Sequence, residues 1–400
     1  MSEQELTAVI LAAGEGRRLA PLTNRRPKPM LPVANKPLLE YVVDAVVKAG
    51  IERVVLVVGY QRDRIQTHFG DGDDWNIEIR YAIQEKQLGT AHALEQAKSV
   101  VDGPLLVLNG DRIIEPSAVA AVREQLTTTG NPAAMAIRRS RQPSSYGVVT
   151  LTQGTITDIV EKPIGDSPSQ LINAGVYGFD TAAIFDAIAD LSPGPDGEYQ
   201  LTDALSILLE AHEITPVRYD GRWLDVSHLW DLLTVTGQVL DSTAAGGDFR
   251  QQTGSGTSPS APTISDNAYV ADTATLGANV VLGRDTVVSE NAHVGPNATI
   301  ERSVIFPDAR VGAGAVLRDC IVGANATVGD NVTVPSGEST VVIEEVAYHP
   351  TAFGGVIGDN ASVGGGTTLE PGTIIGDAAT VAPGVTVGGT IADSETVRRG

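Results

Sequence analysis

The sequence predicts two domains of different class, an α/β domain over residues 1–240 and an all-β repeat domain over residues 263–400. In the first part, short apolar runs alternate with amphipathic helical stretches, which is typical of a largely parallel sheet covered on both faces. In the second part, an aliphatic residue recurs every six positions, which indicates stacked repeats. Four hundred residues with 42% hydrophobic content also exceed what one compact core accommodates.

The first domain has strand and helix signals along its whole length. We expect a crossover helix at 37–50, because proline stands in its first turn, apolar residues follow at helical spacing, and glycine comes just past its end. Strands are expected at 6–13, 53–58, 77–84 and 104–109, and later helices at 180–190, 201–212 and 228–240.

A segment rich in glycine, serine and proline, residues 241–262, is predicted to be a flexible linker. After it, three hexads would make one triangular coil, with each aliphatic side chain stacked on its equivalent about 4.8 Å along the axis. This pattern resembles the left-handed parallel β-helix of hexapeptide-repeat proteins. Residues 335–355 interrupt it and are predicted to leave the coil as a surface loop, with a functional site as the alternative. The repeating aliphatic positions are Val270, Leu276, Leu282, Val288, Val294, Ile300, Ile305, Val311, Leu317, Val322, Val328, Val334, Ile357, Val363, Leu369, Ile375, Val381 and Val387.

The composition narrows the classes of partner. The net charge of −21, from 49 acids against 28 bases, disfavours nucleic acid and anionic membranes as partners. Only six of the bases are lysine, and we interpret the dispersed acidity as an adaptation to a high-salt cytoplasm, with an ordinary acidic protein as the alternative. The single cysteine, Cys320, cannot form an internal disulfide, and the apolar run near the N-terminus is too short to span a membrane. We therefore expect a cytoplasmic protein.

A glycine loop with two arginines follows the first predicted strand. Backbone N–H groups in such a loop bind phosphates well. Leu19 stands where a dinucleotide fingerprint has its third glycine, and the Gly-Lys-Ser/Thr ending of a P-loop is absent. Taken alone, the Gly14-x-Gly16 turn could also be an ordinary tight turn.

The loop and its continuation carry a family resemblance. Leu-Ala-Ala-Gly-x-Gly-x-Arg-Leu-x-Pro-Leu-Thr, followed by Pro-Lys-Pro-Met-Leu at 27–31, resembles the signature of sugar-1-phosphate nucleotidylyltransferases, or NDP-sugar pyrophosphorylases. With the repeats, the chain resembles archaeal glucose-1-phosphate thymidylyl- and uridylyltransferases and bifunctional GlmU-like proteins. The resemblance implies an α/β Rossmann-like nucleotidyltransferase domain plus an all-β left-handed parallel β-helix. It assigns phosphate neutralisation to Arg18 and Lys28, while Arg17 departs from the usual threonine or serine. The residues it assigns to the triphosphate are Leu11, Ala12, Ala13, Gly14 and Gly16.

Two further segments of the same family concern the base and a metal. The stretch around Gln84 and Gly89 resembles the base-recognition segment, and a glutamine amide can pair with the imide edge of uracil or thymine. Asp111 ends a buried strand, where ligands bind in open α/β sheets, and by resemblance Asp225 supplies a second carboxylate. Two aspartates suit Mg²⁺, which prefers few carboxylates plus waters and phosphate oxygens. Asp225 could instead cap the helix that follows.

Three short motifs resemble the sugar side of the family. By resemblance, Gly147, Glu161 and Asn173 contact sugar hydroxyls, and Lys162 reaches the sugar phosphate. The Glu-Lys-Pro motif at 161–163 could also be a solvated strand end. A Leu-Thr-Asp stretch at 201–203 is predicted to open a helix, with Thr202 or Asp203 as its cap.

These motifs predict transfer of a nucleoside monophosphate from UTP or dTTP to a sugar-1-phosphate, with glucose-1-phosphate or N-acetylglucosamine-1-phosphate favoured. A GTP-using mannose-1-phosphate guanylyltransferase is the alternative on the nucleotide side. A third hypothesis is an inactive nucleotide-sensing scaffold. The presence of both aspartates and both lysines disfavours it.

The repeat domain has two interpretations. It could add an acetyl-CoA-dependent acetyltransferase, but the His-Leu-Ser-Tyr segment expected to supply the base is absent, and His293 and His349 lie outside a matching motif. We favour assembly into a homo-trimer, because flat solenoid faces pack readily about a threefold axis.

Overall fold

The computed structural model describes residues 6–165, 167–195, 197–246, 260–350 and 352–398. The chain forms two compact units. The first comprises residues 1–15, 27–30 and 37–225, and the second comprises residues 16–26, 31–36 and 226–400. The first is a mixed α/β fold, and the second contains three stacked parallel sheets that form a β-helix. The predicted fold class is confirmed.

Nine of the described strands form the central sheet of the first unit, along the path β10-β9-β11-β6-β1-β4-β5, with β8 attached to β11 and β12 attached to β8. Strands β6, β1, β4 and β5 are parallel, whereas β11 is antiparallel to β6, β8 and β9. The expected largely parallel sheet therefore holds for only one half. The strands are β1 (Thr7–Ala12), β4 (Arg53–Val58), β5 (Glu78–Ile83), β6 (Leu105–Asn109), β8 (Ala133–Arg139), β9 (Gly147–Thr152), β10 (Thr155–Glu161), β11 (Leu171–Phe179) and β12 (Ile214–Arg218).

One antiparallel pair, β9 with β10, follows from a short connection. Gln153 and Gly154 join β9 to β10, and both have positive φ, at 53° and 94°. Two such residues make the tight turn that suits the twist of a β-hairpin, whereas parallel neighbours need a long crossover.

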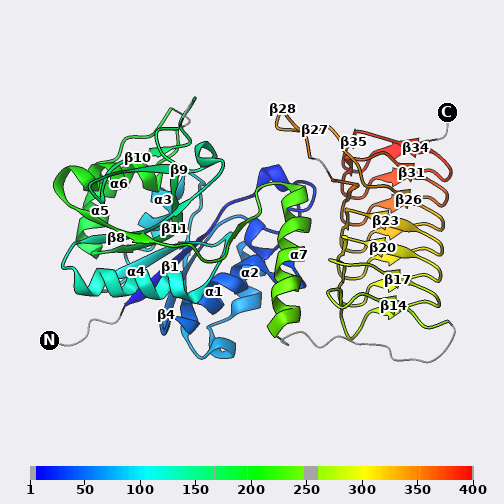
Figure 1. Ribbon diagram of the computed structural model, residues 1–400, viewed down its shortest axis with the longest axis horizontal. Helices are drawn as coiled ribbons and strands as arrows, with labels where there is room; N and C mark the ends of the chain where they lie inside the picture. The colour runs from blue at the N-terminus through cyan, green and yellow to red at the C-terminus, as the bar shows by residue number, and fades with distance from the viewer. Residues whose placement is uncertain (1–5, 166, 196, 247–259, 351, 399–400) are drawn as a thin grey trace. The chain divides into compact units, whose positions relative to one another are not determined.

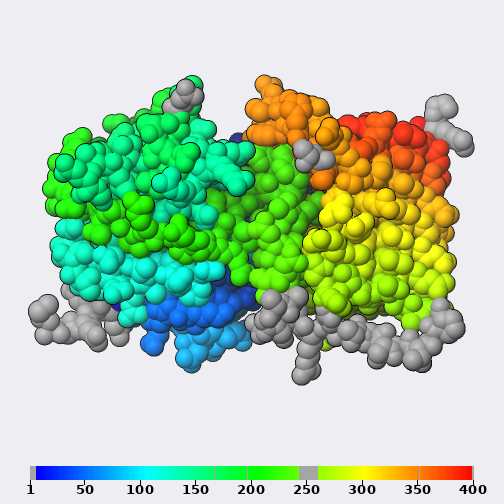
Figure 2. Space-filling model, viewed as in Figure 1, coloured from blue at the N-terminus to red at the C-terminus, as the bar shows by residue number. Residues whose placement is uncertain are grey.

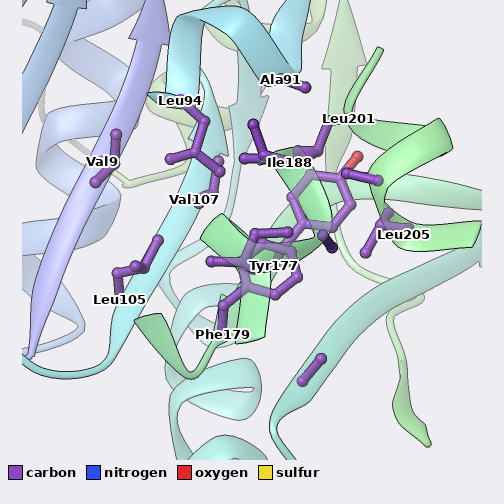
Figure 3. Close-up of a cluster of buried hydrophobic side chains, with 14 of the residues drawn as sticks. Val9, Ala91, Leu94, Leu105, Val107, Tyr177, Phe179, Ile188, Leu201 and Leu205 are labelled. Atoms are coloured by element: carbon purple, nitrogen blue, oxygen red, sulfur yellow. The ribbon is translucent and has the colours of Figure 1, made fainter. Parts of the chain in front are cut away.

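Helices cover both faces of the sheet. Along β1, Val9 points into the core beneath α3, α5 and α6, while Ala8 and Ile10 point into the core beneath α1, α2 and α4. Figure 3 shows the first of these cores, where Val9, Val107 and Tyr177 lie among helix residues such as Leu94 and Leu205. The helices are α1 (Leu38–Lys48), α2 (Arg62–Phe69), α3 (Thr90–Gln96), α4 (Pro116–Thr128), α5 (Thr181–Ala189) and α6 (Leu201–Ala211), with 3₁₀ turns at Lys28–Met30, Asp73–Trp75 and Pro143–Ser145.

One helix start differs from the prediction. Helix α6 begins at Leu201 with Gln200 as its N-cap, so Thr202 and Asp203 lie inside the first turn and not at the cap position. The backbone N–H of Leu201 instead donates to Thr90 Oγ1 at 2.8 Å. A hydroxyl from another helix thus satisfies one of the N–H groups at the start of α6.

Parallel pairing brings the carboxyl ends of three strands to one edge of the sheet. Leu11 of β1 lies opposite Val57 of β4 and Asn109 of β6. Beyond this edge, β7 (Arg112–Ile114) and β13 (Trp223–Asp225) form a two-stranded antiparallel ladder. The glycine loop after β1 and the Asn-Gly-Asp turn after β6 therefore emerge side by side.

The second unit is a regular stack of short strands. Figure 1 shows one of its three sheets as the column β14, β17, β20, β23, β26, β31 and β34. The predicted aliphatic positions stack in register, as in Val294, Val311 and Val328. The first sheet comprises β14 (Thr263–Ile264), β17 (Val281–Leu282), β20 (Thr299–Glu301), β23 (Val316–Arg318), β26 (Thr333–Val334), β31 (Thr368–Leu369) and β34 (Thr386–Val387). The second comprises β15 (Tyr269–Val270), β18 (Val287–Val288), β21 (Val304–Ile305), β24 (Cys320–Val322), β29 (Gly355–Ile357), β32 (Thr373–Ile375) and β35 (Thr390–Ile391). The third comprises β16 (Thr275–Leu276), β19 (His293–Val294), β22 (Arg310–Val311), β25 (Thr327–Val328), β30 (Ser362–Val363), β33 (Thr380–Val381) and β36 (Thr396–Val397).

The turns of the coil use residues that tolerate a left-handed backbone. Many positive-φ corners are asparagine or aspartate, which adopt this conformation more easily than other side chains because they bond locally to the backbone. Glycine after an aliphatic residue has another cause. A Cβ at Gly312 would lie 2.5 Å from the backbone N of Asp330 in the next coil, so only glycine permits that coil spacing. The asparagine and aspartate corners are Asn279, Asp285, Asn291, Asn297, Asp308, Asp319, Asn325, Asn331 and Asn360.

The break in the repeats leaves the coil as a β-hairpin. Strands β27 (Val341–Ile343) and β28 (Val346–Tyr348) pair antiparallel, and the excursion stands out from the coils in orange in Figures 1 and 2. The coil resumes in register, because β24 pairs directly with β29 across the break. Inside the same unit the Tyr348 ring lies 4.5 Å from that of His228, at the start of α7 (Leu229–Gly246).

Helix α7 runs beyond the predicted helix end at 240, into the segment predicted to be a linker. Extending an existing helix costs far less than nucleating one. The rest of the predicted linker, residues 247–259, lies outside the described residues.

The second unit also includes part of the N-terminal signature. Residues 16–26 contain a 3₁₀ turn, Arg17–Leu19, and residues 31–36 contribute strand β2 (Pro32–Val33) and the start of β3 (Lys36–Pro37). The buried Arg26 guanidinium pairs with Asp359 and lies over the Phe306 ring at 4.8 Å. No helix in the described part of the chain has the length and apolarity that crossing a bilayer requires.

Candidate functional site

Two turns of the first unit pack closely because they contain glycine. The Gly110 N–H donates to the Leu11 carbonyl at 2.9 Å, and a Cβ at Gly110 would lie 2.8 Å from that oxygen. A Cβ at Gly59, after β4, would lie 2.9 Å from the Gln84 carbonyl and 3.1 Å from that of Ala13. The ends of β1, β4, β5 and β6 therefore meet without intervening side chains, so the motifs that follow these strands share one edge.

A lysine and two aspartates form the polar centre of this edge. Lys28 Nζ lies 2.6 Å from Asp111 Oδ2 and 4.0 Å from Asp225 Oδ1. Asp111 follows β6, whereas Asp225 ends β13 and lies opposite Arg112 in the β7–β13 ladder. Asp225 also accepts a hydrogen bond from the Tyr146 hydroxyl at 3.3 Å. The structure thus brings together three residues that the sequence predicted for phosphate and metal binding.

The carboxylate of Asp111 is held in its ionised form. Partial burial by itself would raise its pKa, but the charges of Lys28 and Arg112, with the Lys28 hydrogen bond, lower the pKa to about 2. The same pairing acts on Arg112. Burial lowers the pKa of Arg112, and the charges of Asp225 and Asp111 outweigh this and raise it.

The two carboxylates fit a divalent cation. Both lie within reach of the same ammonium group, so one cation can be shared between them. Among the described residues, no group of three or more histidine, cysteine, aspartate or glutamate side chains could hold a metal. A cation here would take its remaining ligands from water and substrate oxygens, which is how Mg²⁺ binds in phosphate-transferring sites.

Arg112 is a functional candidate that the sequence analysis missed. Its guanidinium lies 5.2 Å from the Tyr146 ring centroid and 4.7 Å from that of Trp223, and these rings meet edge to face. Nearby, Gly175 has φ of +77°, and a Cβ there would lie 2.9 Å from Asn109 Nδ2. A basic residue next to a strand-end aspartate was the available signal. The aromatic partners come from distant segments and could not be paired by sequence alone.

The three predicted sugar-binding residues lie together. A Cβ at Gly147 would lie 2.2 Å from Asn173 Nδ2 and 3.0 Å from Glu161 Oε2, so both side chains pack against this glycine. The Tyr177 hydroxyl donates to Asn173 Oδ1 at 2.9 Å and orients the amide. Antiparallel pairing of β9 with β10 puts Glu161 opposite Gly147.

The predicted base-recognition residues adopt a more specific arrangement than the sequence suggested. Gln84 Nε2 donates to the Gly89 carbonyl at 3.0 Å and lies 2.9 Å from His92 Nδ1. Both amide protons are used in this way, which leaves the amide oxygen for an N–H donor on a ligand. Gly89 does not simply provide space for a base, because a Cβ there would lie 2.4 Å from the Tyr199 carbonyl.

The remaining predicted residues of the first unit lie in different environments. Leu11 and Ala12 are strand residues of β1, and the Ala13 carbonyl accepts from Gln87 Nε2 at 3.0 Å, a contact that the sequence analysis missed. Gly14 is exposed, with open space where a Cβ would stand. Lys162 is 61% exposed, with φ of 40°, and its Nζ lies 3.5 Å from Glu161 Oε1.

Gly16 and Arg18 belong to the second unit. Gly16 has a left-handed backbone, with φ of 72°, and its carbonyl accepts from Thr23 Oγ1 at 2.9 Å. Arg18 is exposed in the 3₁₀ turn that follows. The hydrogen bond closes the loop on itself and leaves the arginine side chain in solvent.

Comparisons with known proteins identify several similar chains. The chain is 31% identical over 397 residues to a bifunctional protein GlmU of Methanococcus maripaludis, covering 93% of this chain and 92% of the relative. It is 37% identical over 226 residues to the UTP–glucose-1-phosphate uridylyltransferase AglF of Haloferax volcanii, covering 56% of this chain and 92% of the relative. A solved Bacillus anthracis structure, assigned as a glucose-1-phosphate thymidylyltransferase in complex with sucrose, superposes with a TM-score of 0.54 at 25% identity, covering 58% of this chain and 94% of that chain.

Two family models match along the chain. Residues 264–354 match the GMPPB C-terminal domain, which lies within the β-helix. Residues 7–242, more than half of the chain, match the model described as nucleotidyl transferase. The chain therefore belongs to the nucleotidyl transferase family.

Proposed function

We propose that this chain transfers a nucleoside monophosphate from UTP or dTTP to a sugar-1-phosphate and releases pyrophosphate. The observation that carries the proposal is the Lys28–Asp111–Asp225 cluster, which lies at the sheet edge where the glycine loop also begins. Arg112 links this cluster to the sugar residues, because it contacts Tyr146, the neighbour of Gly147 in the chain. Charged groups for phosphates thus adjoin polar groups for hydroxyls.

The proposed transfer needs positive charges and correctly positioned substrates, and it does not need a general base. A phosphate monoester loses its second proton near pH 6, so the attacking oxygen is already ionised at neutral pH. It attacks the α-phosphorus in line as the bond to pyrophosphate breaks. The barrier is repulsion between anions, which Lys28, Lys162 and Arg18 would reduce at the phosphate oxygens. A Mg²⁺ ion held by Asp111 and Asp225 would supply further positive charge.

The proposed base preference rests on Gln84. Its free amide oxygen suits the N3–H of uracil or thymine. Guanine also carries a ring N–H donor, so a GTP-using mannose-1-phosphate enzyme is the second candidate on this side. The uridylyltransferase relative favours UTP and glucose-1-phosphate. N-acetylglucosamine-1-phosphate is the other proposed acceptor.

The test is a matrix of substrates. Purified full-length chain with Mg²⁺ is given UTP, dTTP, GTP, ATP or CTP with glucose-, N-acetylglucosamine- or mannose-1-phosphate, and pyrophosphate release is followed in low and high KCl. We expect the highest kcat/KM with UTP or dTTP and a gluco-configured acceptor, and no release in EDTA. Preference for GTP with mannose-1-phosphate would replace the proposal by its alternative. Absence of pyrophosphate release with every substrate pair would refute it.

A second activity has one observation in its favour. The bifunctional relative aligns over nearly the whole chain, β-helix included. Acetyl transfer to an amino sugar phosphate needs a base near the amine. The two histidines of the β-helix domain are exposed, and His349 Nδ1 lies 3.2 Å from Thr340 Oγ1. Acetyl-CoA with glucosamine-1-phosphate, assayed for free thiol, decides the question. Thiol release that a His349→Ala variant loses would establish the second activity.

The β-helix is proposed to assemble the chain into a homo-trimer. Its short strands form three parallel sheets, and the faces of such a solenoid can pack about a threefold axis. Light scattering of the full chain measures the mass directly. A monomer at assay concentration would contradict the proposal without affecting the proposed activity.

A further inference from the structure

The carboxylate pair is already neutralised by the protein's own cations. Lys28 Nζ reaches both Asp111 and Asp225, and Arg112 Nε lies 3.9 Å from Asp111 Oδ1. Two negative side chains therefore meet two positive ones. Asp225 is almost buried, with 6% of its side chain exposed, so little water remains to screen these charges.

The two cations are held in different ways. Arg112 is fixed by packing, because its guanidinium lies against the rings of both Tyr146 and Trp223. Lys28 stands in a three-residue 3₁₀ turn, and within the described part of the chain its ammonium contacts only the two aspartates. The lysine stem has several rotatable bonds, so the ammonium can turn from the carboxylates toward a stronger anion when one arrives.

We propose that Lys28 occupies the divalent-cation position between Asp111 and Asp225 in the substrate-free enzyme, so that ammonium and metal compete for the same carboxylates. The inference rests on the proposed function, in which these aspartates hold the metal. A neutral cluster attracts a divalent cation weakly, and an ammonium about 4 Å away repels it. A bound triphosphate changes both conditions, because it offers Lys28 a new partner and offers the metal oxygen ligands. Metal and nucleotide should therefore bind cooperatively, with Lys28 as the exchanged charge.

The experiment measures Mn²⁺ binding to the nucleotide-free, full-length chain by the EPR signal of free Mn²⁺. Lys28→Gln removes the competing charge, and we expect it to bind Mn²⁺ at least about tenfold more tightly than the wild type, while its turnover falls. Lys28→Arg keeps a cation and should bind Mn²⁺ as weakly as the wild type. Lys48→Gln makes the same change of net charge at the exposed end of α1 and should leave Mn²⁺ affinity unchanged. Circular dichroism and the thermal midpoint verify that each variant is folded.

The outcomes separate this inference from the proposed function. Mn²⁺ binding to folded Lys28→Gln that is equal to or weaker than wild-type binding overturns the inference. Asp111→Asn in the Lys28→Gln background should remove the gained affinity. If it does not, Asp111 is not a metal ligand and the proposed function loses its metal site. Wild-type Mn²⁺ affinity should also rise when a non-hydrolysable UTP analogue is present, and that rise should be smaller in Lys28→Gln, because the competing charge is already gone.

Discussion

The β-helix and the α/β unit depend on the sequence in opposite ways. In the β-helix one role is repeated along the chain, so Val294, Val311 and Val328 each fill the same position one coil apart. In the α/β unit each role occurs once, and Asp111 meets Asp225 only because β7 pairs with β13. Because the same position is repeated in every coil, the β-helix is easy to recognise and each of its residues is partly redundant. Because each residue of the site occurs once, the site depends on every one of them.

This difference predicts two kinds of damage. A repeat contacts mainly its neighbours, so a defect in the β-helix should lower stability locally and leave chemistry intact. A change in the Lys28–Asp111–Asp225 cluster should remove chemistry and leave the fold intact, because these side chains lie at a sheet edge outside the hydrophobic clusters.

The largest expected effect is on turnover. Asp111→Asn keeps the shape of the side chain but removes the charge that pairs with Lys28 and is proposed to hold the metal. We expect kcat to fall by about a thousandfold or more, since an oriented charge at a phosphoryl-transfer site contributes about 4 kcal/mol. Pyrophosphate release with saturating substrates measures this.

The control for this change is Asp74→Asn, which makes the same chemical substitution on an exposed residue of the same unit. It should retain wild-type turnover. Full activity of a folded Asp111→Asn protein would contradict both the proposed site and the contrast between the units.

The next effect is on stability, in the other unit. Leu317→Ala empties part of the β-helix interior, where Leu317 is fully buried, and should lower the free energy of unfolding by about 2–5 kcal/mol. Calorimetry should show the β-helix transition move to lower temperature while kcat is retained. An equal shift of every transition, or loss of activity with the fold intact, would show that the units are not independent in this respect.

Cys320 reports the same unfolding by an independent route. It lies in the β-helix core, and burial, with the nearby charge of Asp319, raises the pKa of its thiol from 9.0 to about 12. A raised pKa keeps the folded thiol protonated, so its contribution to stability is present below pH 9 and is lost as the pH rises toward 12. At pH 8 the thiol should react with a disulfide reagent only through opening of the coil, and faster in Leu317→Ala.

How much could be predicted also differs between the units. The six-residue period predicted the β-helix, because every inward position must hold a buried aliphatic side chain. The Asn and Asp corners, such as Asn325 and Asn331, carried an equally regular signal that the sequence analysis left out. In the α/β unit, strand and helix existence could be predicted from local periodicity. The antiparallel half could not, because it depends on which distant strands pair.

The candidate site shows the same limit at the level of side chains. Motifs predicted Lys28, Asp111 and Asn173 but no geometry, and the sequence could not show that Gln84 uses its amide protons on Gly89 and His92. Arg112 was missed because its aromatic partners lie far away along the chain. Pairwise contacts between distant segments are the information that a single sequence lacks.

A moderate effect is expected at the sugar-phosphate side. Lys162→Met removes an ammonium at the end of β10, and the loss of one charged hydrogen bond costs about 1.5–3 kcal/mol, or about ten- to a hundredfold in kcat/KM. The effect should appear mainly in KM for the sugar-1-phosphate, with the KM for the nucleotide changed less than about twofold. Lys162→Arg should recover part of it. An equal rise in both KM values would assign Lys162 to the triphosphate instead.

The smallest effect tests why the coil corners use asparagine. Asn325 has φ of 57°, and its side chain makes no hydrogen bond to another described residue, so we interpret its role as conformational. Asn325→Ala should lower the free energy of unfolding of the β-helix by about 1 kcal/mol, because alanine disfavours the left-handed region. Asn325→Gly should be close to neutral, since glycine enters that region freely but also gains entropy in the unfolded chain. Chemical denaturation followed by Cys320 reactivity resolves the two variants. If alanine and glycine behave alike, the corner depends on the asparagine side chain itself, and the β-helix would then be less redundant than its repeats indicate.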